Sequence, residues 1–375
     1  MTPLDAASGL GGLNNPRQPA GITRRPRPVV SVNGVRLPAA CVVSIDVTNA
    51  SHFTADTYRV ELAVGALPPG FDQTYWAESQ DDRVSVAVSL DGETPAALVV
   101  GHVDDVEWDV TGRRITLSGR DLSAAFIDNK TAEKFQNQTA SQIARTLAAR
   151  RGLDANVQDT ATLAGAYYQI DHALSTQEQT EWDLLTYLAE REGFDVWVSG
   201  TTLNFREPPS LTAPPYVLLW SEPGDGTFAS NAVGMTLARS QTLARDVVVT
   251  VRSWNQKQQA AFTVTAKRSQ TKKTQRRGGT AQTYSYVRAN LTREQAERFA
   301  EAKAEEITRH ERVVSASLPA DNALTTRAAV RLVGTGTDWD QVYYPDSVTR
   351  RLSMQGGYRM DVRAKNHSVQ DSLLV

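Results

Sequence analysis

The sequence predicts a β-rich α+β protein, with two related β-barrel domains and a small α+β domain inserted between them. Three observations predict this class. Apolar and polar residues alternate with period two through many short segments, as in strands with one buried face. The period becomes helical between residues 122 and 206. A second strand-rich region, with one long helix, then continues to Asn366.

The first β-barrel domain is expected over residues 29–121. Residues 1–28 are predicted to be a flexible arm, because Gly, Pro, Asn and Ala dominate them and little apolar surface can be buried. Asn33-Gly34 and Asp91-Gly92 are two-residue hairpin signals. Cys41, the single cysteine, begins an apolar strand, and a buried small hydrophobic residue explains it better than a nucleophile does.

Residues 122–207 are predicted to form the inserted α+β domain. Thr139–Gln142 and Ser175–Glu178 each match a capping box, which satisfies the first free amides of a helix. Gly152 and Gly193 mark the ends of the two helices that follow. The prolines between 208 and 215 indicate a stiff boundary after this domain.

The second β-barrel domain is expected over residues 208–366, with a long helix at 292–311 and a C-terminal tail at 367–375. Thr292 and Gln295 form another capping box at the start of the helix. Residues at helical spacing predict its buried stripe: Ala296, Phe299, Ala300, Ala304 and Ile307. Charged residues fill the other faces, so the helix is expected to lie on an apolar surface of this barrel.

A basic run between two strands of the second domain is the strongest electrostatic feature of the chain. It contains Lys267, Arg268, Lys272, Lys273, Arg276 and Arg277. Two interpretations stay open for it. It is either a solvated loop that keeps a strand edge soluble, or a contact with an acidic partner surface or passing DNA.

No pattern in the sequence predicts catalytic, cofactor-binding or metal-binding residues. The five histidines are scattered, and a metal site at His102 and Asp104 is outweighed by a solvated strand face. The carboxylates that could form a glycosidase pair are interpreted as solvent-facing residues in or near one helix: Glu178, Glu181, Glu190 and Glu192. The net charge of −2 argues against nucleic-acid binding by bulk positive charge.

A weak internal repeat favours a duplicated barrel. Val103–Asp121 aligns without gaps on Val348–Asn366, so that Gly112 meets Gly357 and Arg120 meets Lys365. Each copy has the pattern of a strand, a glycine turn and an alternating strand. A duplicated barrel that the 122–206 unit divides would leave such a repeat.

The order and spacing of several motifs resemble the late-control protein D family, the baseplate hubs of contractile phage tails. These motifs are Ser118–Leu122, Thr139–Ala144, Trp182–Leu185, Ala189–Phe194, Gly334–Asp340 and Tyr343–Thr349. The resemblance covers most of residues 29–366 and implies that both β-barrel domains are of the tube type. It also implies a homotrimeric ring that adapts a six-fold tail tube to a three-fold central spike and lets DNA pass.

The resemblance further implies partners and a location. The partners are other copies of the chain, a central spike protein, a tail tube or tube-initiator protein, a tape-measure protein and baseplate wedge proteins. DNA is expected only in passage, without sequence-specific binding. The location is the tail baseplate of a virion that assembles in the host bacterial cytoplasm, and no enzymatic activity is expected. Two alternatives stay open: the hub of a phage-derived secretion or injection device, and a peptidoglycan-binding or wall-degrading tail protein acting through residues 122–206.

Overall fold

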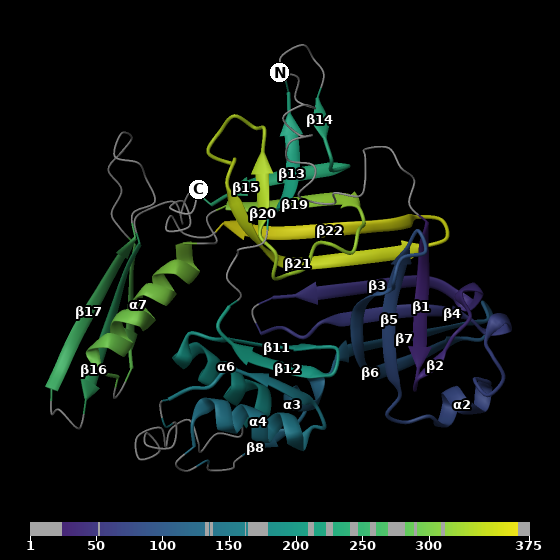
Figure 1. Ribbon diagram of the computed structural model, residues 1–375, viewed down its shortest axis with the longest axis horizontal. Helices are drawn as coiled ribbons and strands as arrows, with labels where there is room; N and C mark the ends of the chain where they lie inside the picture. The colour runs from purple at the N-terminus through teal and green to yellow at the C-terminus, as the bar shows by residue number, and fades with distance from the viewer. Residues whose placement is uncertain are drawn as a thin grey trace.

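The computed structural model has one large β-rich body with smaller units of helices and strands beside it (Figure 1). It describes residues 25–51, 53–131, 135, 138–161, 163, 179–208, 214–222, 228–240, 247–255, 260–268, 282–288, 291–308 and 312–366. The predicted β-rich α+β class is confirmed, because a single 14-stranded sheet forms the body. Within the described ranges, no helix is long and apolar enough to cross a membrane.

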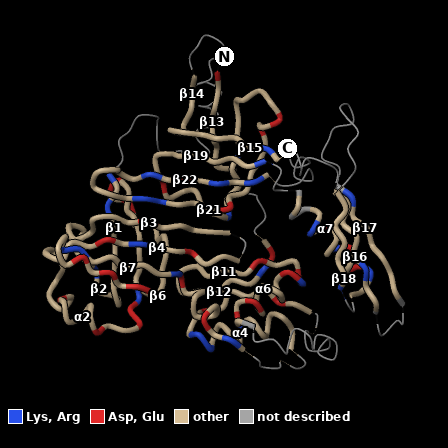
Figure 2. Tube along the Cα trace, turned by 180° about the vertical axis from the view of Figure 1, so that it is seen from behind, with Lys and Arg blue, Asp and Glu red and all other residues tan. Residues whose placement is uncertain are grey.

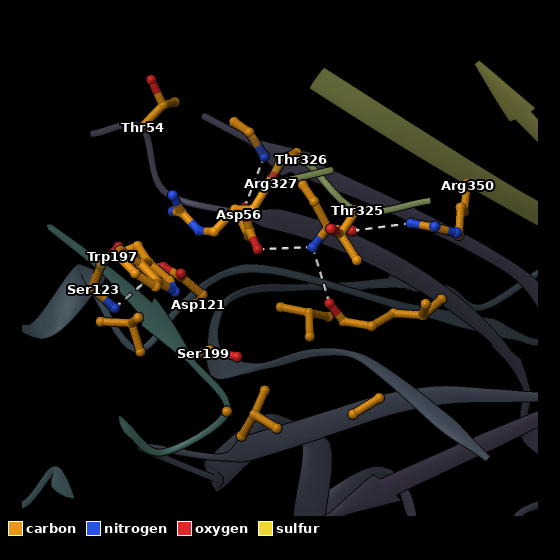
Figure 3. Close-up of a pocket in the computed structure, with 18 of the residues that line it drawn as sticks. Thr54, Asp56, Asp121, Ser123, Trp197, Ser199, Thr325, Thr326, Arg327 and Arg350 are labelled. Carbon is orange, nitrogen blue, oxygen red and sulfur yellow. Dashed lines mark hydrogen bonds between the residues drawn. The ribbon is translucent and has the colours of Figure 1, made fainter. Parts of the chain in front are cut away.

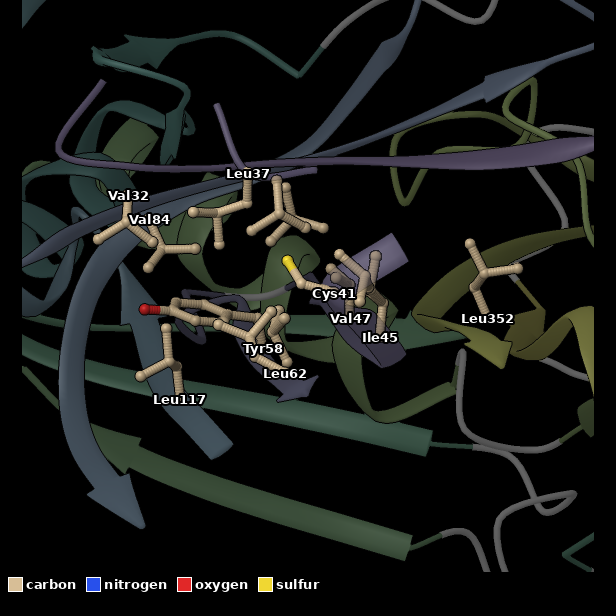
Figure 4. Packing of buried hydrophobic residues seen from close by; sticks show 14 of the residues in the cluster. Val32, Leu37, Cys41, Ile45, Val47, Tyr58, Leu62, Val84, Leu117 and Leu352 are labelled. Carbon is tan, nitrogen blue, oxygen red and sulfur yellow. The ribbon is translucent and has the colours of Figure 1, made fainter. Parts of the chain in front are cut away.

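The first β unit encloses a core of alternating strand residues. Its elements are β1 (Pro26–Val32), β2 (Val35–Arg36), η1 (Ala39–Cys41), β3 (Val42–Ala50), β4 (Thr57–Ala63), η2 (Val64–Ala66), α2 (Gln73–Glu78), β5 (Arg83–Leu90), β6 (Ala96–Asp109) and β7 (Arg114–Asp121). Figure 4 shows Tyr58 and Leu62 converging with Cys41, which is fully buried as predicted. Leu352 of the second unit joins this core. Strand β1 starts at Pro26, earlier than the expected domain start at residue 29, because it pairs with β5 from there.

The unit between residues 122 and 206 packs its two longer helices on a small sheet. Its elements are α3 (Ala124–Ile127), β8 (Lys130–Thr131), α4 (Ala140–Arg150), β9 (Asp154–Val157), β10 (Gln179–Thr180), α6 (Glu181–Glu192), β11 (Asp195–Ser199) and β12 (Thr202–Arg206). Thr139 and Gln142 form the predicted capping box of α4. The box predicted at 175–178 lies outside the described residues, and α6 is capped instead by Thr180 with Asp183.

The second β unit has its own core. Its strands are β13 (Tyr216–Ser221), β14 (Ala229–Ser230), β15 (Gly234–Arg239), β19 (Arg312–Pro319), β20 (Val330–Val333), β21 (Val342–Ser353) and β22 (Gly357–Asn366). Tyr343, Val348 and Met360 are fully buried between them. This unit and the first belong to one sheet, because the long strand β21 pairs with β3.

A further unit interrupts the second one. It consists of β16 (Val247–Asn255), β17 (Ala260–Arg268), β18 (Gln282–Val287) and α7 (Arg293–Thr308). These strands form a separate sheet of order β17-β16-β18, and α7 packs on β16 and β17 (Figure 1). The expectation that the long helix covers the second barrel therefore changes: the helix covers its own sheet, because the alternating strands 247–287 offer it a separate apolar face.

The two β units share a four-stranded repeat. In the first unit the order is β3-β4-β7-β6, and in the second it is β15-β19-β22-β21. Each pair of facing residues (a rung) between β4 and β7 has a counterpart between β19 and β22. Tyr58 faces Gly119 in the first repeat, and Val314 faces Ala364 in the second. The same correspondence places Val47 of β3 on Leu237 of β15, each directly opposite these residues.

The repeat includes a β-bulge at the same rung of both hairpins. In β6 the extra residue is Asp104, between the partners of Gly119 and Ser118. In β21 it is Asp346, between the partners of Ala364 and Arg363. The alignment without gaps that the sequence suggested is therefore right where it places β7 on β22. Where it places β6 on β21, it is three residues out of the register that the bulges define. The second hairpin is longer at its turn, where Ser353 pairs with Gly357.

Candidate assembly surface

One face of the shared sheet is polar across both repeats. It consists of the strand residues that alternate with the core residues, and most of them are Ser, Thr, Arg, Asp or Glu. They include Thr236 on β15, Ser315 and Ser317 on β19, Arg359, Asp361 and Arg363 on β22, Thr349 and Arg351 on β21, Asp46 and Thr48 on β3, Arg59 and Glu61 on β4, Thr116 and Ser118 on β7, and Glu107 and Asp109 on β6. We call this set the polar sheet face.

The charges on the polar sheet face are largely paired across strands. Arg351 contacts Asp46 of β3 at 3.0 Å and also pairs with Asp361 of β22. Arg114 donates to Glu61 at 2.6 Å. Figure 2 shows Lys and Arg along β21 and β22, and acidic residues along β6. Paired charges and hydroxyl groups give a hydrated surface without a large field of one sign.

The bulges carry matching ion pairs. Arg120 on β7 donates from Nε to Asp104 at 2.7 Å, and Lys365 on β22 donates to Asp346 at 2.8 Å. Arg120 also donates to Asp128 at 2.8 Å. A bulge re-aims the backbone of one strand, and in both repeats the extra residue is an aspartate held by a basic residue of the next strand. The sequence already aligned Arg120 with Lys365, but the two aspartates were missed because the first strands are shifted.

A cavity of about 300 Å³ lies where the two β units and the inserted unit meet (Figure 3). Arg350 of β21 is buried beside it and donates to the carbonyl oxygen of Asp321 at 3.0 Å and to Asn49 at 3.4 Å. Asn49 in turn donates to Asp56 at 2.7 Å. The sequence pattern missed Arg350, because a buried arginine interrupts the apolar side of an alternating strand.

A second arginine ties the inserted unit to the second β unit. Arg327 stacks on the Trp197 ring, with its guanidinium carbon 3.7 Å from the ring centroid, and lies 3.5 Å from Asp195. Trp182 donates to the carbonyl oxygen of Phe53 at 2.7 Å, which ties the same unit to the first β unit. The inserted unit is thus bound to both halves at the cavity.

Burial changes the ionisation of the acids at this junction. It raises the pKa of Asp121 to about 7, an effect that the nearby Asp56 increases and the Ser123 hydrogen bonds oppose. Burial also raises the pKa of Asp56, which Asn49 counters, and lowers the pKa of Arg327. The junction therefore contains groups whose charge is sensitive to the packing of three units.

One of the glutamates considered for catalysis, Glu181, is buried and ion-paired. Glu181 was expected to face solvent, but its side chain is only 1% exposed. It accepts from Arg151 at 2.7 Å and from Arg150 at 3.2 Å, because α4 brings these arginines against the start of α6. Glu178 lies outside the described residues. Among the described residues no three His, Cys, Asp or Glu side chains are grouped as metal ligands would be.

The basic run and the buried helix stripe predicted from the sequence both involve elements of the unit formed by β16, β17, β18 and α7. Lys267 and Arg268 end strand β17, and the other four basic residues of the run lie outside the described residues. On α7, the alanines of the expected stripe (Ala296, Ala300 and Ala304) are fully buried against β16. Phe299 and Ile307 are partly buried beside them, and Phe299 packs edge-on against Tyr286.

Comparison with known proteins identifies a related group. The family model for the phage tail baseplate hub matches residues 60–356. No curated protein sequence matches the chain. Among solved structures, a tail protein from Neisseria meningitidis is similar, with a TM-score of 0.64, 15% identity, and coverage of 91% of this chain and 96% of that one.

Two other solved structures are similar in fold. A tail protein of prophage MuSo2 from Shewanella oneidensis has a TM-score of 0.63 and 15% identity, and the match covers 91% of this chain and 98% of that one. A type VI secretion system component from E. coli, described as structurally similar to phage T4 tail proteins gp27 and gp5, has a TM-score of 0.52 and 12% identity. That match covers 91% of this chain and 77% of the other. At these identities the likeness concerns the fold.

Proposed function

Because this chain belongs to the phage tail baseplate hub family, we propose that it forms a homotrimeric ring that adapts a six-fold tail tube to a three-fold spike. The main observation that supports this ring is the four-stranded repeat. Three copies of a chain with two such repeats would present six similar strand units around one axis. The parts outside the repeat occur once per chain and would keep three-fold symmetry.

The polar sheet face is proposed to line the channel of this ring. It continues without a break across both repeats, since β3 and β21 are paired. Its hydroxyl groups and paired charges would let DNA pass without holding it, because salt bridges already neutralise Arg59, Arg114 and Arg351. A channel lining of this kind explains why the polar residues form one continuous face that crosses from β21 to β3.

The proposed partners follow from the symmetry of the two sides. The pseudo-six-fold side would receive a tail tube or tube-initiator protein and the end of the tape-measure protein. The three-fold side would hold the central spike protein, and the outer surface would contact baseplate wedge proteins. The proposed location is the tail baseplate of a virion assembled in the host bacterial cytoplasm, and the proposed role is structural rather than enzymatic.

Two alternatives differ in their support. The hub of a secretion or injection device is compatible with the fold likeness to the E. coli type VI component. The chain's presence in purified virions, in fixed ratio to capsid protein, would favour the phage role over this alternative. A wall-degrading role through residues 122–206 has less support, because the buried Glu181 is held by two arginines.

Native mass measurement of the purified full chain tests the ring. The expected result is a trimer, or a trimer that forms when the spike protein is added. A density map of the particle should then show six similar strand units on the tube side. A stable monomer in both conditions, or a hexamer of this chain, would contradict the proposal.

A further inference from the structure

The chain contains one complete joint between its two repeats. Along it, β21 and β3 pair antiparallel from Ser347↔Ala50 to Ser353↔Ser44. The side chains on the core side of this joint are deeply buried, among them Val348 at 0% and Val47 at 0% exposure. On the polar side, the hydroxyl oxygens of Thr349 and Thr48 are 3.0 Å apart. The joint therefore defines how one repeat continues into the next.

The two strands equivalent to this joint lie at the outer ends of the repeats. The rungs of the repeat map β21 onto β6 and β3 onto β15. Among the described residues, the segment of β6 from Asp104 to Asp109 pairs only with β7, because the pairing of β5 with β6 ends at Arg83↔His102. In the same described part of the chain, β15 pairs only with β19. Each of these strands thus has one edge that matches half of the complete joint.

The burial of the core-side residues differs between the complete joint and these two edges. Val348 is fully buried, whereas its counterpart Val106 is 38% exposed. Val47 is fully buried, whereas its counterpart Leu237 is only partly buried. Apolar residues on an open strand edge are a hazard for aggregation. Val106 and Leu237 occupy the positions of Val348 and Val47, which the pairing of β21 with β3 buries.

We propose that β6 of one copy of this chain pairs with β15 of the next copy, in the register of the joint between β21 and β3. Glu107 then lies opposite Ala238 of the neighbouring copy, and Trp108 lies opposite its Leu237. The pairing is antiparallel and would bury Val106 and Trp108 on the core side. This inference rests on the proposed ring, and it identifies the surface that closes it.

Two properties of the edges favour another copy of the same chain as the occupant. The edges are different from each other, so each copy offers one of each and the contact is head-to-tail, which can close into a ring. Their chemistry is also compatible. The polar side of β6 carries Glu107 and Asp109, whereas the facing positions of β15 are Ala238 and Thr236, so no like charges meet.

Disulfide trapping in the full chain tests the register. The variant Glu107→Cys/Ala238→Cys places thiols at the rung equivalent to Thr349 and Thr48. The variant Thr349→Cys/Thr48→Cys is the matched control for geometry, because it should form the bond within one chain. The variant Asp105→Cys/Ala238→Cys is the control for register, since a two-residue offset separates the side chains too far for a disulfide. The native Cys41 is buried and stays in all three.

For the first pair we expect covalent dimers and trimers on a non-reducing gel, which disappear when a reductant is added. For the offset pair we expect almost none. Trapping by the offset pair, or no trapping in a protein that is trimeric by native mass, overturns the register while the ring survives. A monomer by native mass overturns the ring and this pairing together. Ladders longer than trimers support the pairing of the edges and contradict closure of the ring.

Hydrogen exchange on the unaltered assembly gives a readout that needs no substitution. The amides of Met235–Ala238 that point away from β19 should exchange as slowly as the amides of β3 that donate to β21. Rapid exchange at these amides in a trimeric protein would overturn the pairing, because a paired edge protects its amides.

Discussion

The two repeats solve the same packing problem with different residues beside the bulge. In the first repeat, Gly119 leaves room for Tyr58, whose hydroxyl donates to the carbonyl oxygen of His102 at 2.9 Å. In the second, Ala364 faces Val314, and both are fully buried. The aspartate of the bulge and its basic partner are common to both repeats. The comparison indicates that the bulge is the constant element, whereas the large and small residues around it can be exchanged as a pair.

The repeats also differ in what joins their first two strands. In the first repeat, residues 51–56 connect β3 to β4. In the second, the segment between β15 and β19 contains β16, β17, β18 and α7, with a core of their own. An insertion at this connection leaves the rungs of the repeat unchanged. Strand pairing in the repeat is therefore independent of the length of this connection.

The largest expected effect tests that independence. Ala300→Asp places an unpaired charge in the buried face of α7, at a cost on the order of several kcal/mol. Hydrogen exchange should show loss of protection at Val247–Val251, while Val314–Leu318 stays protected. The control Glu301→Lys lies on the exposed face of the same helix and should change little. Loss of protection in both segments would mean that the insertion and the second repeat fold as one unit.

Gly119→Ala should be the next largest effect. A Cβ at this position would lie 2.0 Å from the carbonyl oxygen of His102, which is backbone and cannot move freely. We expect local destabilisation of the first repeat by about 2–3 kcal/mol, measured as the opening free energy of the Leu117 amide. The matched change in the second repeat, Ala364→Gly, should cost only about 1 kcal/mol. Equal effects would show that the two rungs are not packed differently.

Much of the local structure could be predicted from the sequence, because local chemistry determines it. The capping boxes at Thr139 and Thr292 form as expected. Asn33 and Gly34 both have positive φ, 49° and 81°, as the hairpin turn requires. The similarity of β7 to β22 was visible because both strands keep small and basic residues at equal spacing.

The assignment of strands to sheets could not be predicted, because alternation marks a strand but not its neighbours. Alternation alone therefore assigns the strands at 247–287 to the second barrel. The burial of Glu181 was missed for a related reason: its partners Arg150 and Arg151 lie about 30 residues away in the chain, and only the packing of α4 against α6 brings them together. The joint of β21 with β3 depends on residues about 300 apart.

Asp121→Asn should produce a pH-dependent effect, and it copies the second repeat, which has Asn366 at this rung. The pKa of Asp121 is raised in the folded state to about 7, so the folded chain binds a proton that the unfolded chain has lost. Stability from this group is therefore greatest below about pH 4 and decreases as the pH rises to about 7.

Asp121→Asn should remove this loss of stability at high pH. Its free energy of unfolding should exceed that of the parent by about 2 kcal/mol at pH 8, and the difference should disappear near pH 4. Urea unfolding at several pH values measures it. Asp128→Asn is the control, because Arg120 lowers the pKa of that carboxyl and its removal should not stabilise the protein at high pH. A parent and variant with parallel pH profiles would show that Asp121 does not titrate between these limits.

The smallest expected effect concerns the ion pairs of the bulges. Arg120 makes a bidentate contact with Asp104 and also binds Asp128, whereas Lys365 makes one contact with Asp346. Arg120→Lys should cost about 0.5–1 kcal/mol, because a lysine cannot reproduce the planar fork. Lys365→Arg should be close to neutral. Double-mutant cycles with Asp104→Asn and Asp346→Asn measure the coupling in each repeat, and both couplings should be favourable and larger in the first. A favourable coupling in only one repeat would mean that the bulge itself, without its ion pair, is what the duplication has kept.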